Sequence, residues 1–151
     1  MTRVDFYHLQ KQNLEQVLPK LLEKAYSTGK NIKVKVGNEM RVEFLNSHLW
    51  TFDDTSFIPH GSKKDGFAEL QPIWFSPDDD NPNHAELLFL VDGAAVDTDT
   101  AAKFERIFNI FDGNLDSAVE QSRGLWKLFK GAEMETYYWQ QDDNGRWTQK
   151  A

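Results

Sequence analysis

The feature that most constrains the fold is the alternation of β-type and helical apolar spacing over residues 3–50. Residues 3–9, RVDFYHL, alternate and are rich in β-forming side chains, whereas residues 14–29 carry apolar side chains at helical spacing. The same pair of patterns repeats in residues 31–37, NIKVKVG, and residues 38–50, NEMRVEFLNSHLW. Strands and helices that alternate with short connections are typical of a parallel β-α-β layer.

Pro19 complicates the first helical segment, because a proline in a helix interior removes one hydrogen bond and clashes with the preceding turn. Asn13 is a candidate N-cap, but we expect the regular helix to begin near Pro19, where the fixed φ of proline is favourable. In the second helical segment, the spacing of Val42, Leu45 and Leu49 predicts that these three side chains face the core.

The next part of the chain is expected to add strands to the same layer. Residues 72–76, PIWFS, predict a short strand. Residues 86–93, ELLFLVDG, predict a central strand that is buried on both faces, because the run is almost continuously apolar. Between them, residues 76–85 predict a solvated acidic turn.

Two helices and a tail are expected after the central strand. A helix that ends at Gly113 is predicted by the spacing of Phe104, Ile107, Phe108 and Phe111. Residues 114–131 predict a last helix, capped by Asn114 or Asp116. The tail forms either a hairpin that turns at Asn144-Gly145 or a single edge strand.

Together the segments predict one domain over residues 1–151, an α/β fold in three layers with a mostly parallel central sheet and helices on both faces. Such a layer often binds a nucleotide, but residues 8–16, which follow the first strand, contain no glycine. The chain also lacks G-x-G-x-x-G and G-x-x-x-x-G-K-[ST], so its backbone cannot approach a pyrophosphate closely at that turn. We therefore expect a Rossmann-like fold without a nucleotide site.

The composition argues against several kinds of cofactor and catalytic site. The chain has no cysteine, which excludes disulfides, thiolate metal sites and a cysteine nucleophile. The acidic run from Asp79 does not fit a calcium loop, because His84 stands where glycine is required. Ser56 and His60 give a Ser-His hydrolase no positive support. We expect no cofactor and no metal, because metal-ligand spacing is absent from the four histidines, His8, His48, His60 and His84.

The charge is negative overall but unevenly distributed. A formal net charge of -7 repels a phosphate backbone, so we expect no direct DNA binding. Residues 121–132, in contrast, contain Arg123, Lys127 and Lys130 and no acidic residue. On a helix these cations share one face with Trp126 on its flank, an arrangement that suits a short acidic peptide with an apolar end. The alternative is that the cations only complement the helix C-terminus and that Trp126 belongs to the core.

Residues 49–61, LWTFDDTSFIPHG, hold more large apolar rings than a loop usually carries. Trp50 and Phe57 either anchor a partner protein or seal the end of the sheet. Phe52 and Ile58 are candidates for the sealing role, and we expect Pro59 and His60 to shape the turn rather than to contact a partner.

Taken in order, six segments of the chain resemble the chi subunit of bacterial DNA polymerase III, a small accessory protein of the clamp-loader complex. The resemblance covers nearly the whole chain and is most specific where Leu-Trp is followed by Ser-Phe-Ile-Pro-His. The segments are FYHL at 6–9, LLEKAYSTGK at 21–30, LWTFDDTSFIPHG at 49–61, QPI at 71–73, FERIFNIFD at 104–112 and SRGLWKLFKG at 122–131.

The resemblance implies a non-enzymatic adaptor with two contact surfaces and no catalytic residues. One surface holds the psi subunit of the clamp loader, or in some bacteria a helicase-like repair protein, and its residues match Trp50 and Phe57. The other surface binds the acidic C-terminal tail of single-stranded DNA-binding protein, and its residues match Arg123, Trp126 and Lys127.

The chain departs from the family pattern at one position. The family has a lysine about one turn before the arginine, whereas Val119 and Glu120 stand in that neighbourhood here. Lys103 or Arg106 could compensate if the predicted helices pack side by side.

Two alternative functions stay open at this point. The chain could bind single-stranded nucleic acid directly, with its aromatic residues as stacking platforms. It could also be a degenerate α/β enzyme with a ligand in the crevice at the carboxyl ends of the strands. We expect a cytoplasmic protein without a membrane segment, because the sequence has no apolar run of signal-peptide or membrane-span length.

Overall fold

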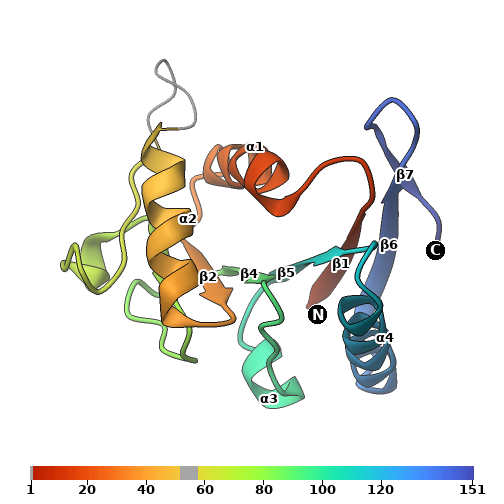
Figure 1. Cartoon of the computed structure of the whole chain (residues 1–151). Coiled ribbons are helices and arrows are strands. Elements are labelled where there is room, and N and C mark those ends of the chain that lie inside the picture. Colours follow the sequence, from red (N-terminus) through yellow and green to blue (C-terminus); the bar gives the residue numbers. More distant parts are fainter. Residues whose placement is uncertain (1, 52–57) are drawn as a thin grey trace.

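A seven-stranded sheet with the strand order β3-β2-β4-β5-β1-β6-β7 runs through the molecule (Figure 1). The computed structural model describes residues 2–51 and 58–151. Neighbouring strands pair in parallel, except for the antiparallel pair β6 and β7. The strands are β1 (Arg3–Leu9), β2 (Ile32–Val36), β3 (Ile73–Ser76), β4 (Leu87–Val91), β5 (Arg106–Asp112), β6 (Glu135–Gln141) and β7 (Trp147–Gln149).

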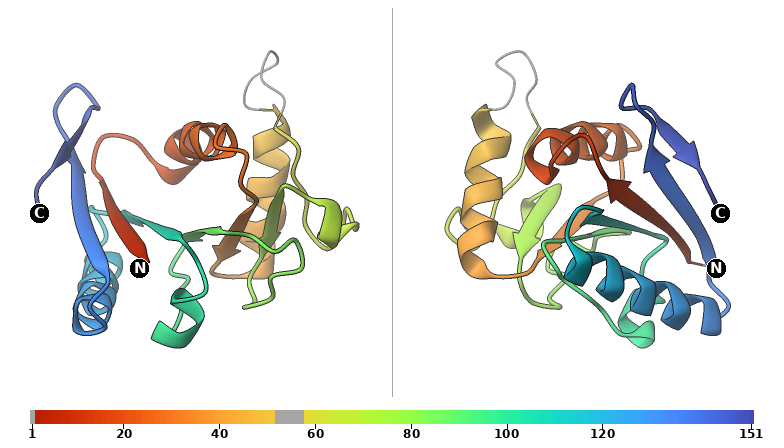
Figure 2. Two further views of the ribbon diagram at one scale, coloured as in Figure 1. Left: turned by 180° about the vertical axis from the view of Figure 1, so that it is seen from behind. Right: turned by 45° about the vertical axis from the view of Figure 1, so that its right-hand side comes forward.

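Helices cover both faces of this sheet, which confirms the predicted three-layer α/β fold (Figures 1 and 2). α1 (Leu14–Tyr26) and α2 (Glu39–Thr51) bury their apolar sides in one core cluster. α3 (Thr98–Ala101) and α4 (Asp116–Gly131) belong to a second cluster on the opposite face. A 3-10 turn, η1 (Ala68–Leu70), precedes β3. In the described part of the chain, none of the helices has the length and apolarity that crossing a membrane requires.

α1 begins at Leu14 and not near Pro19, so that prediction was wrong. Asn13 and Gln16 form a capping box, which satisfies backbone donors of the first turn. Pro19 lies inside the helix and cannot donate to the carbonyl oxygen of Glu15, four residues earlier. His48 of α2 takes the place of that donor, because its Nε2 lies 2.8 Å from the Glu15 oxygen. The proline is therefore accommodated by a contact between helices.

β5 replaces the helix that was predicted to end at Gly113, so this prediction was also wrong. The residues from Ile107 to Phe111 are buried without alternation, because helices cover both faces of the sheet at β5. A strand buried on both faces has no two-residue period, and its apolar residues can coincide with helical spacing. β4, whose five residues are all buried, is the central strand that was predicted.

The start of α4 also differs from the prediction. The N-cap position is occupied by Leu115, and no side chain caps the helix there. The Nδ2 group of Asn114 instead donates to the carbonyl oxygen of Gln10, 3.1 Å away in the loop after β1. Asn114 thus links the β5–α4 loop to the β1–α1 loop, and Asp116 is the first residue of the helix.

The tail forms the hairpin alternative, with β6 and β7 joined by a turn that contains Gly145 at a φ of 80°. The aspartates of the acidic turn after β3 are exposed, as predicted, and the Asp80 carboxylate also accepts a hydrogen bond from Lys33 Nζ at 2.9 Å. Lys33 is 1% exposed, so the turn covers a buried cation on β2.

Gly37, directly after β2, is predicted to be a position where even a methyl group destabilises the fold. A Cβ atom at Gly37 would lie 2.0 Å from the carbonyl oxygen of Asp92, in the loop after β4. We expect Gly37→Ala to lower the free energy of unfolding by about 2–3 kcal/mol, measured by urea denaturation. Gly124→Ala is the control, because the added Cβ in exposed α4 meets no atom within 4 Å. It should stabilise the protein by about 1 kcal/mol, and equal effects of the two changes would contradict the account.

Candidate functional site

The outward face of α4 presents the predicted row of cations. Arg123, Lys127 and Lys130 are all exposed, whereas Leu125 and Phe129 are buried in the second core cluster. Spacings of four and seven residues place the three cations on one side of the helix. We call Arg123, Lys127, Lys130 and the adjoining Trp126 the α4 face.

Trp126 lies at the border between this face and the core. Its ring meets Phe6 edge-on at a centroid distance of 5.3 Å and Tyr138 at 6.2 Å. Lys130 Nζ lies 5.2 Å from the centre of the Trp126 ring, in a cation–π position. Trp126 is only partly buried, so it can both support the core and offer ring surface to a ligand.

The three cations of the α4 face have no carboxylate partner among residues 2–51 and 58–151. Burial raises the pKa of the nearby Tyr138 hydroxyl, and the positive charge of Arg123 opposes that shift. Arg123 therefore lies close enough to Tyr138 to affect it electrostatically. An aromatic wall beside uncompensated cations can hold an anionic group and an apolar ring at the same time.

Neither residue considered as a substitute for the family's lysine serves this face. Arg106 lies in β5 on the opposite side of the sheet, where its Nε donates to Asp5 Oδ2 at 2.8 Å. Lys103 lines a shallow depression with Ala132 and Glu133, beyond the C-terminal end of α4. Neither Lys103 nor Arg106 therefore supplies a cation at the position one turn before Arg123.

Trp50 stands at the C-terminal end of α2 and is 45% exposed. Its ring lies over the ring of His60, with the centroids 4.0 Å apart and the planes inclined by 31°. Phe57, the second residue predicted for this surface, and Phe52, one of the two residues predicted to seal the sheet, lie outside the described residues. Ile58 is 5% exposed and belongs to the core, in agreement with its predicted sealing role.

His60 holds the loop against α2 from within. It is 3% exposed, with Nδ1 2.6 Å from the Ile58 carbonyl oxygen and Nε2 2.9 Å from that of Asn46. Asn46, which lies in α2, in turn donates through Nδ2 to Asp65, 2.7 Å away in the loop that contains His60. His60 thus shapes the turn, as expected, and supports the ring of Trp50 from below.

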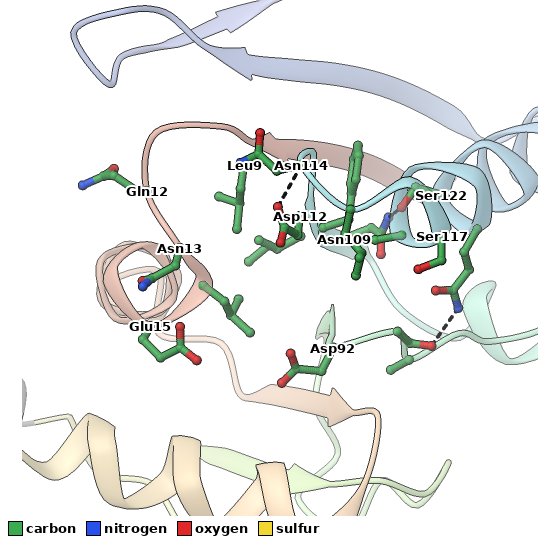
Figure 3. Close-up of a pocket in the computed structure, with 18 of the residues that line it drawn as sticks. Leu9, Gln12, Asn13, Glu15, Asp92, Asn109, Asp112, Asn114, Ser117 and Ser122 are labelled. Carbon is green, nitrogen blue, oxygen red and sulfur yellow. Dashed lines mark hydrogen bonds between the residues drawn. The ribbon is translucent and has the colours of Figure 1, made fainter.

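A crevice of about 720 Å³ opens at the carboxyl ends of β1, β4 and β5, between the N-termini of α1 and α4 (Figure 3). From β1 the chain crosses to β2, towards the β3 edge of the sheet, whereas from β5 it crosses to β6, towards the β7 edge. This is the point in an open α/β sheet where ligands usually bind. Its lining mixes apolar side chains with polar ones, and the polar ones include Glu15, Asp92, Asn109 and Asp112.

Three of the charged groups that line this crevice, Glu15, Arg41 and Asp92, are engaged with one another. Arg41 donates to Glu15 Oε1 at 2.6 Å and to Asp92 Oδ2 at 2.8 Å, and so joins α1, α2 and the loop after β4. Burial raises the pKa of Glu15, but the hydrogen bond and charge of Arg41 outweigh it and leave the pKa below its usual value. A carboxylate held ionised in this way is a structural group rather than a general acid.

Sequence reasoning placed a ligand crevice here but did not identify Arg41 or Asn109. Asn109 is buried on β5 and donates to Ser122 Oγ of α4 at 3.1 Å. The one available signal for a polar site here was the position of two aspartates in the sequence. Asp92 directly follows β4 and Asp112 ends β5, and the carboxyl ends of these strands meet at one edge of the sheet.

Replacement of Arg41 is predicted to reveal this ion-pair bridge through its pH dependence. We expect Arg41→Met to lower the free energy of unfolding by about 1–2 kcal/mol at pH 7. The folded-state pKa of Glu15 is lowered from 4.5, so its contribution is complete above that pH and is lost as pH falls through the folded value. The difference between the two proteins should therefore shrink below pH 4.5 in urea titrations. A difference in unfolding free energy that stays constant at lower pH would contradict this prediction. So would an Arg41→Met change that costs as much in a Glu15→Gln background as in the wild-type protein.

Comparison with known proteins gives one consistent family. The model of the family described as DNA polymerase III chi subunit, HolC, matches residues 1–136. A protein of Rickettsia prowazekii named probable DNA polymerase III subunit chi is 32% identical over 91 residues, which cover 60% of this chain and 55% of the relative. DNA polymerase III subunit chi of Pseudomonas aeruginosa is 33% identical over 91 residues, 58% of this chain and 63% of the relative. The chain thus matches between about half and two thirds of the length of these relatives.

Proposed function

Because the chain belongs to the DNA polymerase III chi subunit family, we propose that it is a non-catalytic accessory protein of DNA replication. In this proposal it links the psi subunit of the clamp loader to the acidic C-terminal tail of single-stranded DNA-binding protein. Residues 1–151 act as one unit that carries both contacts.

The observation that supports tail binding most directly is the uncompensated charge of the α4 face. Arg123, Lys127 and Lys130 are exposed and form no ion pair with any described residue, on a chain whose net charge is -7. Neighbouring cations without a carboxylate partner create a local positive potential on this acidic protein, and that potential attracts an anionic ligand.

Each part of the α4 face has a role in holding such a tail. The guanidinium of Arg123 binds the terminal carboxylate through two parallel hydrogen bonds, since its fork matches carboxylate geometry. The partly buried ring of Trp126 packs against the apolar residues at the end of the peptide. Lys127 and Lys130 attract the acidic residues that precede them, a contribution that salt weakens.

Reversal of the charge at Arg123 is predicted to abolish tail binding. The probe is a short acidic peptide that ends in proline-phenylalanine with a free carboxylate, titrated by fluorescence anisotropy. We expect Arg123→Glu to weaken binding by at least about thirtyfold, because loss of a charge-assisted pair and a new repulsion together exceed about 2 kcal/mol. Amidation of the peptide C-terminus should have a comparable effect on the wild-type protein.

Lys20→Glu is the matched control, because it makes the same change of net charge at an exposed position on α1. It should leave affinity within about twofold at physiological salt, where charges more than about 8 Å away are screened. Equal losses in Arg123→Glu and Lys20→Glu would show that binding follows net charge, and the assignment of the carboxylate to Arg123 would then be wrong.

The second contact is proposed to be made by Trp50 together with Phe57. Large aromatic rings at the edge of a loop are frequent anchors of protein interfaces. The support of Trp50 by the buried ring of His60 fixes the indole, which lowers the entropy lost on binding. The psi subunit is the proposed partner of this surface, and a helicase-like repair protein is proposed to compete for it.

Trp50→Ala is predicted to release the psi subunit while leaving tail binding intact. We expect its affinity for purified psi subunit to fall by about thirtyfold, since a central aromatic anchor contributes about 2 kcal/mol. Phe44→Ala is the control, because Phe44 is 50% exposed on the same helix but about 120° away around its axis. Undiminished psi binding by the Trp50 variant would remove this surface from the proposal.

A further inference from the structure

A second pocket lies on the α1 side of the sheet, far from the α4 face. α1 does not extend over β6, and the β6–β7 hairpin rises beside the uncovered part of the sheet (Figures 1 and 2). The space between α1, the sheet and the hairpin has a volume of about 490 Å³, within the range of small-molecule sites. We call it the hairpin pocket; its lining includes Arg3, Tyr7, Lys24, Arg106, Trp139 and Trp147.

Aromatic rings form the floor and one wall of the hairpin pocket. Tyr7 on β1 lies nearly parallel to Phe108 on β5, at 6.2 Å and 16°, and to Trp139 on β6, at 6.4 Å and 12°. Trp147 of β7 meets Tyr7 edge-on at 5.0 Å. The two tryptophans are only partly buried, so their rings are accessible from the pocket.

The same pocket holds more positive than negative charge. Asp5 is fully buried and binds both guanidinium groups, Arg3 at 3.0 Å and Arg106 at 2.8 Å. One carboxylate for two arginines leaves an excess of one positive charge. Lys24 adds a second, because it forms no ion pair within residues 2–51 and 58–151. Lys30 adds none, because Glu105 neutralises it.

Asp5 holds the two arginines in position without engaging all of their donor groups. Arg106 donates to Asp5 through Nε, and its guanidinium lies 4.4 Å from the centre of the Phe108 ring. Asp5 is itself fixed by a third donor, Trp139 Nε1, at 2.9 Å. The buried carboxylate thus ties the arginines to the tryptophan, and Arg106 also lines the pocket, where its side chain interacts with the Tyr7 hydroxyl.

From this juxtaposition we infer that the hairpin pocket binds a mononucleotide, with the phosphate at Arg106 and Lys24 and the base against Trp139 and Trp147. A nucleotide unites a planar ring with a phosphate of two negative charges, which matches aromatic walls beside an excess of two positive charges. The net charge of -7 disfavours a long polyanion, so a free nucleotide is the expected source rather than a strand.

This site is separate from the proposed adaptor function. It lies near the amino ends of β1 and β5, whereas the turn that lacks the glycines of a dinucleotide site follows the carboxyl end of β1. Trp139 and Trp147 also come after residue 136, where the match to the family ends.

The test is a titration of the full chain with adenosine monophosphate, followed by NMR of the tryptophan indole NH signals. We expect saturable shifts at Trp139 and Trp147, with affinity at least about tenfold lower for adenosine and for ribose 5-phosphate, which each carry half of the ligand. Lys24→Glu, an exposed position that should not disturb folding, should weaken binding about tenfold or more, and Trp147→Leu likewise. Arg123→Glu, on the opposite face, should have no effect.

Four outcomes decide the inference. Binding that needs both base and phosphate supports it, and a comparison with a 5′-phosphorylated tetrathymidylate identifies whether a free nucleotide or a strand is the source. Ribose 5-phosphate that binds as well as the nucleotide would overturn it in favour of a simple anion site. Stronger binding of the acidic peptide at Trp147 would overturn it in favour of a peptide site. No shift at millimolar nucleotide would also overturn it. None of these outcomes changes the test at Arg123.

Discussion

The parallel pairing of β1 with β5 is the contact on which the other features of the structure depend. It joins the first strand of the chain to one that begins about a hundred residues later, with Arg3 opposite Arg106. This register brings both arginines to the buried carboxylate of Asp5. It also sets the start of α4 beside the loop after β1, where Asn114 bonds to Gln10. The crevice, the hairpin pocket and the orientation of α4 all follow from this pairing.

Much of the fold could be predicted because local patterns and tertiary burial agree. The β-forming side chains of β1, the continuous apolar run of β4 and the apolar stripe of α2 each indicated their element correctly. The exposed cations of α4 were placed correctly for the same reason, since helical spacing alone separates Arg123 from Phe129.

Other features could not be predicted because they depend on partners distant in sequence. β5 has no period of its own to reveal it as a strand, since its burial comes from helices on both sides. Pro19 fits inside α1 because His48 of another helix bonds to the carbonyl oxygen that the proline leaves unpaired. The bridge from Arg41 to Glu15 and Asp92 likewise joins three elements and has no local sequence signal.

The two proposed contact surfaces are well separated, which is what an adaptor requires. α2 packs towards the β3 and β2 end of the sheet, whereas α4 packs under β5 and β6 on the opposite face (Figure 1). The surfaces proposed for the two partners, at the end of α2 and on the α4 face, therefore do not overlap. Two weak contacts on one rigid body raise the effective concentration of each partner near the other, so tight binding at either surface is unnecessary.

The measurement that tests this account most directly is the mass of the complexes formed when the chain is mixed with psi subunit and with single-stranded DNA-binding protein on DNA. Sedimentation velocity with a different fluorescent label on each partner would resolve them. The account predicts a complex that contains all three proteins, forms only when the chain is present, and dissociates as salt is raised. Mutually exclusive binding of the two partners, or their association without the chain, would contradict the central claim.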